Sequence, residues 1–299
     1  MSKYIVTIGD SVHWGQGLAR EHKLHTLVAK AIRAGVPDLV EHHMAHSGAV
    51  IGAGATVTHE RVDGEVPVGS PTILEQAAAF PGDPADVLCV LANGGINDVD
   101  IKNILNPFIS SRQLSDLTRE HCYDSMRVLL EELVLRFPAT TTRIIVTGYY
   151  PILSHHSAVL GLRLYLQLHG IDASLSFTSP LPHGTNPIVD HCLQFWQEST
   201  SCFIEAVAQV RTAHPKARVG FVNPGFTEQH AMFTADPWLF GLDPLLLPED
   251  EVIPGRHGAC DAAIPAHDIL AREQCYRASA GHPNVAGARQ YADAILEAI

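Results

Sequence analysis

The chain has 299 residues, of which 46% are hydrophobic and 17% are charged, a balance typical of a globular protein with a substantial core. Its formal net charge of −12 argues against proteins that bind the nucleic-acid backbone, because these need clustered Lys and Arg side chains. The sequence has no run of about 18 apolar residues and no visible signal peptide, so we expect no stable membrane insertion and predict a cytoplasmic protein.

Short apolar runs that end at glycine or polar residues predict buried strands separated by helices. The first run, at residues 4–8, ends at Gly9 and is followed by apolar residues at helical spacing in residues 24–32. Further strands are expected at residues 39–45, 86–92, 143–147 and 218–222, and further helices at residues 122–134, 192–210 and 285–299. This alternation predicts a mostly parallel sheet with helices on both faces, a three-layer α/β/α sandwich in a single domain, residues 1–299.

Two stretches fall outside this alternation and are expected to form the walls of a pocket. They span residues 149–186 and 225–280, and both follow predicted strand ends, where open α/β sheets bind ligands. Alternating leucines in the first stretch predict either a strand or an apolar flap, and with apolar residues of the second they suggest an acyl-binding wall, although ordinary core contacts are the alternative. These residues are Leu160, Leu162, Leu164, Leu166, Leu168, Phe233, Trp238, Leu239, Phe240 and Leu245–Leu247.

The six cysteines and eighteen histidines show no metal-ligand spacing. The clustered residues His42, His43 and His46 are therefore interpreted as structural rather than as zinc ligands. Cys260 and Cys275 lie in a loop-rich stretch, where free thiols are favoured and a disulfide is the alternative. The remaining cysteines lie in apolar patterns and are expected to be buried thiols: Cys89, Cys122, Cys192 and Cys202.

Four polar or glycine positions are expected to meet at one edge of the sheet. Ser11, Gly48 and Asn97 follow successive predicted strands, and His282 precedes the last helix. A serine hydroxyl needs a base to become a nucleophile, and histidine can accept that proton and later return it. Backbone N–H groups and an amide side chain can then stabilise a tetrahedral oxyanion.

These segments resemble the four sequence blocks of the SGNH hydrolases, also called GDSL esterases and lipases. The matches span the chain in the family's order: Gly9-Asp10-Ser11, Ser47-Gly48-Ala49, Gly95-Ile96-Asn97-Asp98, and His282-Pro283-Asn284 with Gly287. The resemblance implies a flavodoxin-like α/β/α fold, with Ser11 as nucleophile and His282 as base. It further implies an oxyanion hole made by Ser11, Gly48 and Asn97, and a supporting role for Asp10 in the turn.

The sequence departs from the family at the position three residues before the histidine. The family commonly carries an aspartate there, which orients the histidine ring, whereas this chain has Ser279. The substitute is a backbone carbonyl, Ser279 acting through a water, or a carboxylate from the preceding stretch, such as Asp268 or Asp261.

Two functions from different classes follow from this pattern. The first is a serine ester hydrolase that forms an acyl-enzyme from a small-molecule ester and requires no metal or organic cofactor. The second is a catalytically impaired protein that binds an ester, glycan or lipid in the same cleft, because loss of an orienting acid can cost about 10⁴ in turnover. The acyl wall favours lipid or medium-chain esters, a carbohydrate acetyl ester stays open, and the sequence predicts no oligomeric state.

Overall fold

In a computed structural model, the described residues 3–53, 62–138, 140–168, 186–243 and 249–299 form a five-stranded parallel sheet covered by helices. The strand order is β2-β1-β3-β4-β5. The strands are β1 (Lys3–Thr7), β2 (Leu39–His43), β3 (Val87–Ala92), β4 (Arg143–Thr147) and β5 (Arg218–Val222). Each lies within one residue of its predicted start, and the α/β fold class predicted from the sequence is confirmed.

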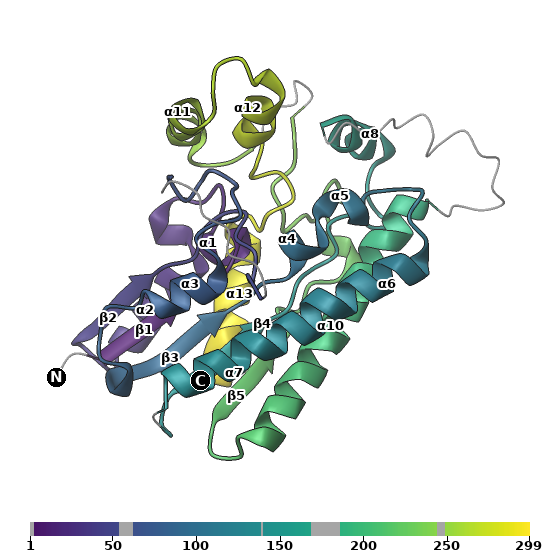
Figure 1. The fold of residues 1–299 in the computed structure, drawn as a ribbon. Helices are drawn as coiled ribbons and strands as arrows, with labels where there is room; N and C mark the ends of the chain where they lie inside the picture. The colour runs from purple at the N-terminus through teal and green to yellow at the C-terminus, as the bar shows by residue number, and fades with distance from the viewer. Residues whose placement is uncertain (1–2, 54–61, 139, 169–185, 244–248) are drawn as a thin grey trace.

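Helices cover both faces of the sheet (Figure 1). Helices α2 and α13 pack together on one face, while α10 packs against α6 and α7 and α3 packs against α7 on the other. Their bounds are α2 Leu24–Arg33, α3 Ile73–Ala78, α6 Ser111–Arg119, α7 Met126–Arg136, α10 Pro187–Ala213 and α13 Val285–Ala298, and a π-helical segment, η3 Glu120–Ser125, joins α6 to α7.

Further helices gather beyond the carboxyl ends of the strands, where α11 and α12 lie at the top of Figure 1. They are α1 Ser11–Trp14, α4 Ile96–Val99, α5 Ile101–Ile104, α8 Val159–Leu168, α11 Ile253–Ala263 and α12 Ile269–Tyr276. Single 3₁₀ turns occur at η1 Arg20–His22, η2 Pro84–Asp86 and η4 Glu228–His230. None of the helices in the described ranges is both long and apolar enough to cross a membrane.

The strand register aligns the turns that carry the candidate residues. Thr7, the last residue of β1, pairs with His43 of β2 on one side and with Leu91 of β3 on the other. The chain segments that leave these three strands therefore start at nearly the same level. The apolar runs of β1 and β3 are buried, as strands between two helical layers require.

Two sequence expectations about the intervening stretches are corrected. The alternating leucines lie on the helix α8 and form no strand, because leucine, arginine and glutamine are good helix formers whose local preference outweighs the period-two pattern. Residues 225–280 are also less loop-rich than expected, since they contain α11 and α12. Leu245–Leu247 and most of residues 169–186 lie outside the described residues.

The free-thiol expectation for one cysteine pair is also wrong. Cys260 of α11 and Cys275 of α12 form a disulfide with a Cα–Cα distance of 6.0 Å. Because both cysteines lie on helices that pack together, the side chains meet in a way that the sequence pattern did not indicate. The four other cysteines are free and buried, as predicted.

Candidate active site

Ser11 and His282 form a hydrogen-bonded pair at the carboxyl edge of the sheet. Ser11 begins α1 directly after β1, and its Oγ lies 2.7 Å from Nε2 of His282. The histidine backbone is held by Phe240, whose N–H donates to the His282 carbonyl over 2.8 Å. Ser11 is nearly enclosed, with 6% of its surface exposed. This spacing permits direct proton transfer from the hydroxyl to the ring.

The turn before Ser11 is fixed by buried polar groups. Asp10 caps α1, since its Oδ1 accepts hydrogen bonds from the Val12 N–H at 2.9 Å and from the Asn93 amide at 2.8 Å. Its Oδ2 accepts the Tyr149 hydroxyl at 2.7 Å. Burial raises the pKa of the Asp10 carboxyl, and the hydrogen bond from Tyr149 lowers it in part. Asp10 thus makes the supporting contacts that the resemblance implied for it.

Glycine is required at the second candidate segment. Gly48 has a φ of +78°, and a Cβ there would lie 2.5 Å from the backbone nitrogen of Val68. Any side chain here would strain the backbone and collide with the chain segment that contains Val68. Hydrogen bonds within the described part of the chain leave the N–H groups of Gly48 and Ser11 unused. Both are available to an oxyanion.

The Asn97 segment is tied to the Gly48 segment by two contacts. Asn97 donates from Nδ2 to the Ala49 carbonyl over 3.0 Å, which leaves the second proton of this amide for a ligand. The Asp98 carboxylate accepts from the Ile51 N–H at 3.1 Å. These two bonds hold the predicted oxyanion donors beside each other, and the Asp98 contact could not be read from the sequence because it depends on tertiary structure.

A cavity of about 330 Å³ opens in front of Ser11 and His282. Gly48 and Asn97 also line it, so all four predicted residues reach one pocket. The remaining wall is largely apolar with a few polar residues: Val12, Ser47, Pro67, Ile96, Ile101, Lys102, Tyr150, Ile152, Tyr165, Gln274, Arg277, Ala278, Ala280 and Gly281. Such a cavity suits a small ligand with an apolar portion.

The residues that line this cavity differ from those of the predicted acyl-binding wall. Leu239 and Phe240 are buried in the protein core and do not line it, and Trp238 instead stacks on His230 at 3.4 Å. Among residues 159–168, Tyr165 is the described side chain that reaches the cavity, while Leu162 and Leu166 are buried core residues. Core contact, the alternative considered for these residues, therefore describes Leu162, Leu166, Leu239 and Phe240 better, whereas Leu160 is 70% exposed.

Both stretches expected to form the pocket walls, residues 149–186 and 225–280, do line this cavity, although the lining residues themselves were not named from the sequence. Tyr150 and Ile152 come directly after β4, at the same sheet edge as Ser11. Their position after a strand is the signal that placed residues 149–186 at the pocket, since ligands bind at the carboxyl ends of parallel strands.

The other ring nitrogen of His282 faces no carboxylate. Within the described residues its Nδ1 is buried without a hydrogen-bond partner. Burial lowers the pKa of His282 to about 4; the backbone carbonyls of Ser279, Ala278 and Ala280 oppose this shift electrostatically, although none is placed to accept a hydrogen bond. The neutral ring, which is the form that acts as a base, is therefore favoured at neutral pH.

Neither predicted carboxylate supplies the missing acid. Asp268 caps α12 by accepting from the Ala271 N–H at 3.1 Å, and Asp261 pairs with Arg272 at 2.9 Å. Both side chains are exposed and engaged away from His282. Ser279 instead donates its hydroxyl to Asp250 over 2.5 Å. Of the substitutes considered, the backbone carbonyls are the groups that raise the pKa of His282, although none forms a hydrogen bond with Nδ1.

The clustered histidines make structural contacts. His43 stacks on His25 with ring centroids 3.7 Å apart, and its Nε2–H donates to the His13 carbonyl over 3.1 Å. His46 is similarly hydrogen-bonded to the Ser47 carbonyl at 2.8 Å. No group of three or more metal-ligating side chains occurs among the residues that the structure describes.

Solved structures with a similar fold are known, although no model of a protein family and no curated protein sequence matches the chain. An extracellular lipase from Streptomyces rimosus is 13% identical with a TM-score of 0.54, and the alignment covers 100% of both chains. A phospholipase A1 from Streptomyces albidoflavus NA297 is 10% identical with a TM-score of 0.53, again over 100% of both chains. At this identity the similarity shows the fold alone, so the chain has an α/β/α fold like that of these two proteins, while its sequence blocks resemble those of the SGNH hydrolases.

Proposed function

We propose that the protein is a carboxylic ester hydrolase that uses a Ser11–His282 dyad. The observation that carries this proposal is the 2.7 Å hydrogen bond between the Ser11 hydroxyl and Nε2 of His282, beside three candidate oxyanion donors in one cavity. A neutral histidine, a serine hydroxyl and unused N–H groups are the parts that acyl transfer requires.

The reaction follows from these positions. His282 takes the hydroxyl proton while Ser11 Oγ bonds to the ester carbonyl carbon, and the resulting oxyanion binds the N–H groups of Ser11 and Gly48 and the Asn97 amide. The C–O bond to the alcohol then breaks, and His282 returns the proton to the leaving oxygen. Water repeats the two steps on the acyl-enzyme, giving the carboxylic acid and free Ser11.

The substrate class proposed is a small-molecule ester with an apolar acyl group. The largely apolar cavity wall, including Tyr150, Ile152 and Tyr165, supports this class. The two similar solved structures are named as a lipase and a phospholipase A1, and both names denote enzymes that cleave esters. No metal or organic cofactor enters this mechanism.

One observation favours the second candidate, a protein that binds an ester in the same cavity without hydrolysing it. The Nδ1 atom of His282 has no carboxylate partner within the described chain, and the imidazolium that forms during catalysis is stabilised less than in a full triad. The intact serine–histidine hydrogen bond favours the enzyme.

The test is covalent labelling with a fluorophosphonate, which reacts with activated serines. Intact mass should show one adduct per chain, mapped to the peptide containing Ser11. Ser11→Ala should remove the adduct and His282→Ala should slow its formation, with circular dichroism confirming that both variants are folded. Folded wild-type protein that gains no adduct would refute the hydrolase and favour ester binding.

A further inference from the structure

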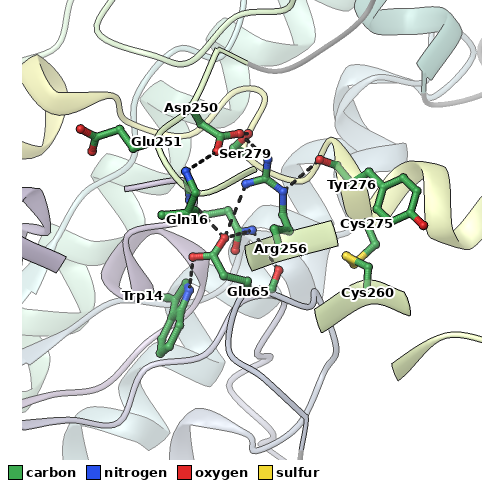
Figure 2. A network of polar contacts seen from close by, with 12 residues as sticks. Trp14, Gln16, Glu65, Asp250, Glu251, Arg256, Cys260, Cys275, Tyr276 and Ser279 are labelled. Atoms are coloured by element: carbon green, nitrogen blue, oxygen red, sulfur yellow. Dashed lines mark hydrogen bonds and ion pairs between the residues drawn. A yellow bond between two sulfur atoms is a disulfide. The ribbon is translucent and has the colours of Figure 1, made fainter. Parts of the chain in front are cut away.

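Glu65, Asp250 and Arg256 form a buried ionic cluster, called here the Arg256 cluster (Figure 2). The Arg256 side chain is 0% exposed and forms an ion pair with the equally buried Asp250. A second guanidinium nitrogen lies 3.6 Å from the Glu65 carboxylate. Burying three ionised groups is costly unless they satisfy one another, so this arrangement needs a physical explanation.

One side of the cluster holds the segment that ends at His282. Arg256 donates from Nε to the Tyr276 carbonyl over 2.9 Å, and Asp250 accepts the Ser279 hydroxyl at 2.5 Å. The Ser279 carbonyl in turn accepts a hydrogen bond from the backbone N–H of His282 over 2.9 Å. The backbone leading to the candidate base is therefore fixed at two points by the cluster.

The other side of the cluster holds the segment that follows Ser11. Glu65 accepts from the Trp14 indole N–H at 2.8 Å and from the Gln16 amide at 2.9 Å. Trp14 is the last residue of α1, the short helix that Ser11 begins. Glu65 thus holds the end of the helix that carries the candidate nucleophile.

The two held segments also touch directly. Gly17 has a φ of +83°, and a Cβ at this position would lie 2.6 Å from the Ser279 Cβ. The Gly17 carbonyl accepts the N–H of Glu251, the neighbour of Asp250, over 3.0 Å. The Arg256 cluster thus lies where the chain after the nucleophile meets the chain before the base.

We propose that Glu65, Asp250 and Arg256 are positioning residues that set the distance between Ser11 and His282. In the family that the sequence resembles, an aspartate at the position of Ser279 orients the histidine. Here the cluster fixes the backbone of that segment and joins it to α1, in place of a carboxylate on the ring. This inference rests on the proposed ester hydrolase. A planar guanidinium suits the task because it donates in several fixed directions at once.

Three substitutions test the proposal without adding bulk: Asp250→Asn, Glu65→Gln and Ser279→Ala. For each variant we measure the rate of fluorophosphonate labelling at Ser11, kcat and KM with p-nitrophenyl butyrate, and Tm. The first two should lower the labelling rate and kcat by about 10- to 100-fold, because small displacements of reacting groups cost this much. KM should change little, since the cluster does not line the cavity. Ser279→Ala should give a smaller loss of the same kind.

Arg256→Lys separates charge from geometry. Lysine keeps the positive charge but cannot reach Tyr276, Asp250 and Glu65 together, so it should leave kcat low. Arg272→Gln is the matched control, because Arg272 also joins α12 to α11 through Asp261 and the Ile264 carbonyl without contacting Ser279. It should retain the wild-type labelling rate.

The outcomes distinguish this inference from the proposed function. If wild-type protein labels at Ser11 and the folded Asp250→Asn, Glu65→Gln and Ser279→Ala variants label equally fast, the positioning role is refuted while the hydrolase stands. A lower Tm with an unchanged rate per folded molecule also refutes it, because that is the result of a purely structural cluster. If wild-type protein itself does not label, the proposed function fails first. Should Asp250→Asn not fold, the Ser279→Ala rate decides.

Discussion

The Tyr149 hydroxyl donates to Oδ2 of Asp10 over 2.7 Å and accepts the N–H of Ile96 at 3.1 Å. One buried phenol thus joins the turn before the candidate nucleophile to the helix that carries Asn97. Tyr149→Phe removes both bonds and leaves the Asp10 oxygen and the Ile96 N–H without this partner. We expect the free energy of unfolding to fall by about 1–3 kcal/mol, measured by urea denaturation.

A tyrosine on the surface provides the control for Tyr149→Phe. Tyr123 is hydrogen-bonded to Gln209 in an exposed position, and Tyr123→Phe should change the free energy of unfolding by less than about 0.5 kcal/mol. Equal stability losses in the two variants would show that the buried bridge contributes nothing specific.

Asn97→Ala should lower kcat by about 10²- to 10³-fold with little change in KM, because an oxyanion donor acts mainly in the transition state. The measurement is steady-state hydrolysis of a p-nitrophenyl ester. Asn103→Ala is a suitable control, since the Asn103 amide also donates to a carbonyl, that of Val99, at 2.8 Å but does not line the cavity. If both variants keep wild-type kcat, Asn97 is not an oxyanion donor.

The labelling rate of Ser11 should stay nearly constant from neutral pH down to about 5 and fall by half near pH 4. The reason is that burial lowers the pKa of His282 to about 4 from its usual 6.5, so the ring remains a neutral base until the pH approaches the lower value. Labelling is followed by intact mass at each pH, with circular dichroism to confirm the folded state. A midpoint near 6.5 in folded protein would contradict the buried environment of the ring.

Replacing both Cys260 and Cys275 with serine should reduce the free energy of unfolding by about 2–4 kcal/mol, because the bond closes a loop between α11 and α12. Wild-type protein in a reducing agent should unfold at the same urea concentration as the double variant. Cys202→Ser, which removes a free thiol, should keep the wild-type response to reductant.

Much of the sheet could be predicted from the sequence, since strands buried between two layers appear as short apolar runs. Residues 143–147 and 218–222 are strands with the expected bounds. The alternation of strands with helices also indicated that Ser11 and His282 would meet, and Nε2 does lie 2.7 Å from Oγ. These features depend on local patterns and on the common direction of parallel strands.

The features that were missed depend on contacts between distant parts of the chain. The Arg256 cluster joins Glu65 to residues near position 250, and neither segment has a distinctive local pattern. The leucines of α8 were misleading because of their local pattern. Their alternation over residues 160–168 fits a strand, but the same residues are strong helix formers and fit a helix as well. Asp261 and Asp268 were sought as catalytic acids on sequence proximity alone, and local helix contacts hold them elsewhere.

The sequence separation of 271 residues between Ser11 and His282 has a consequence for refolding. Helices form from contacts a few residues apart, whereas this hydrogen bond closes only after the intervening sheet and its helical layers have assembled. Recovery of the far-ultraviolet circular dichroism signal after dilution from denaturant should therefore precede recovery of Ser11 reactivity. Chemical labelling of this serine reports the completion of the native topology, while helix content reports only its beginning.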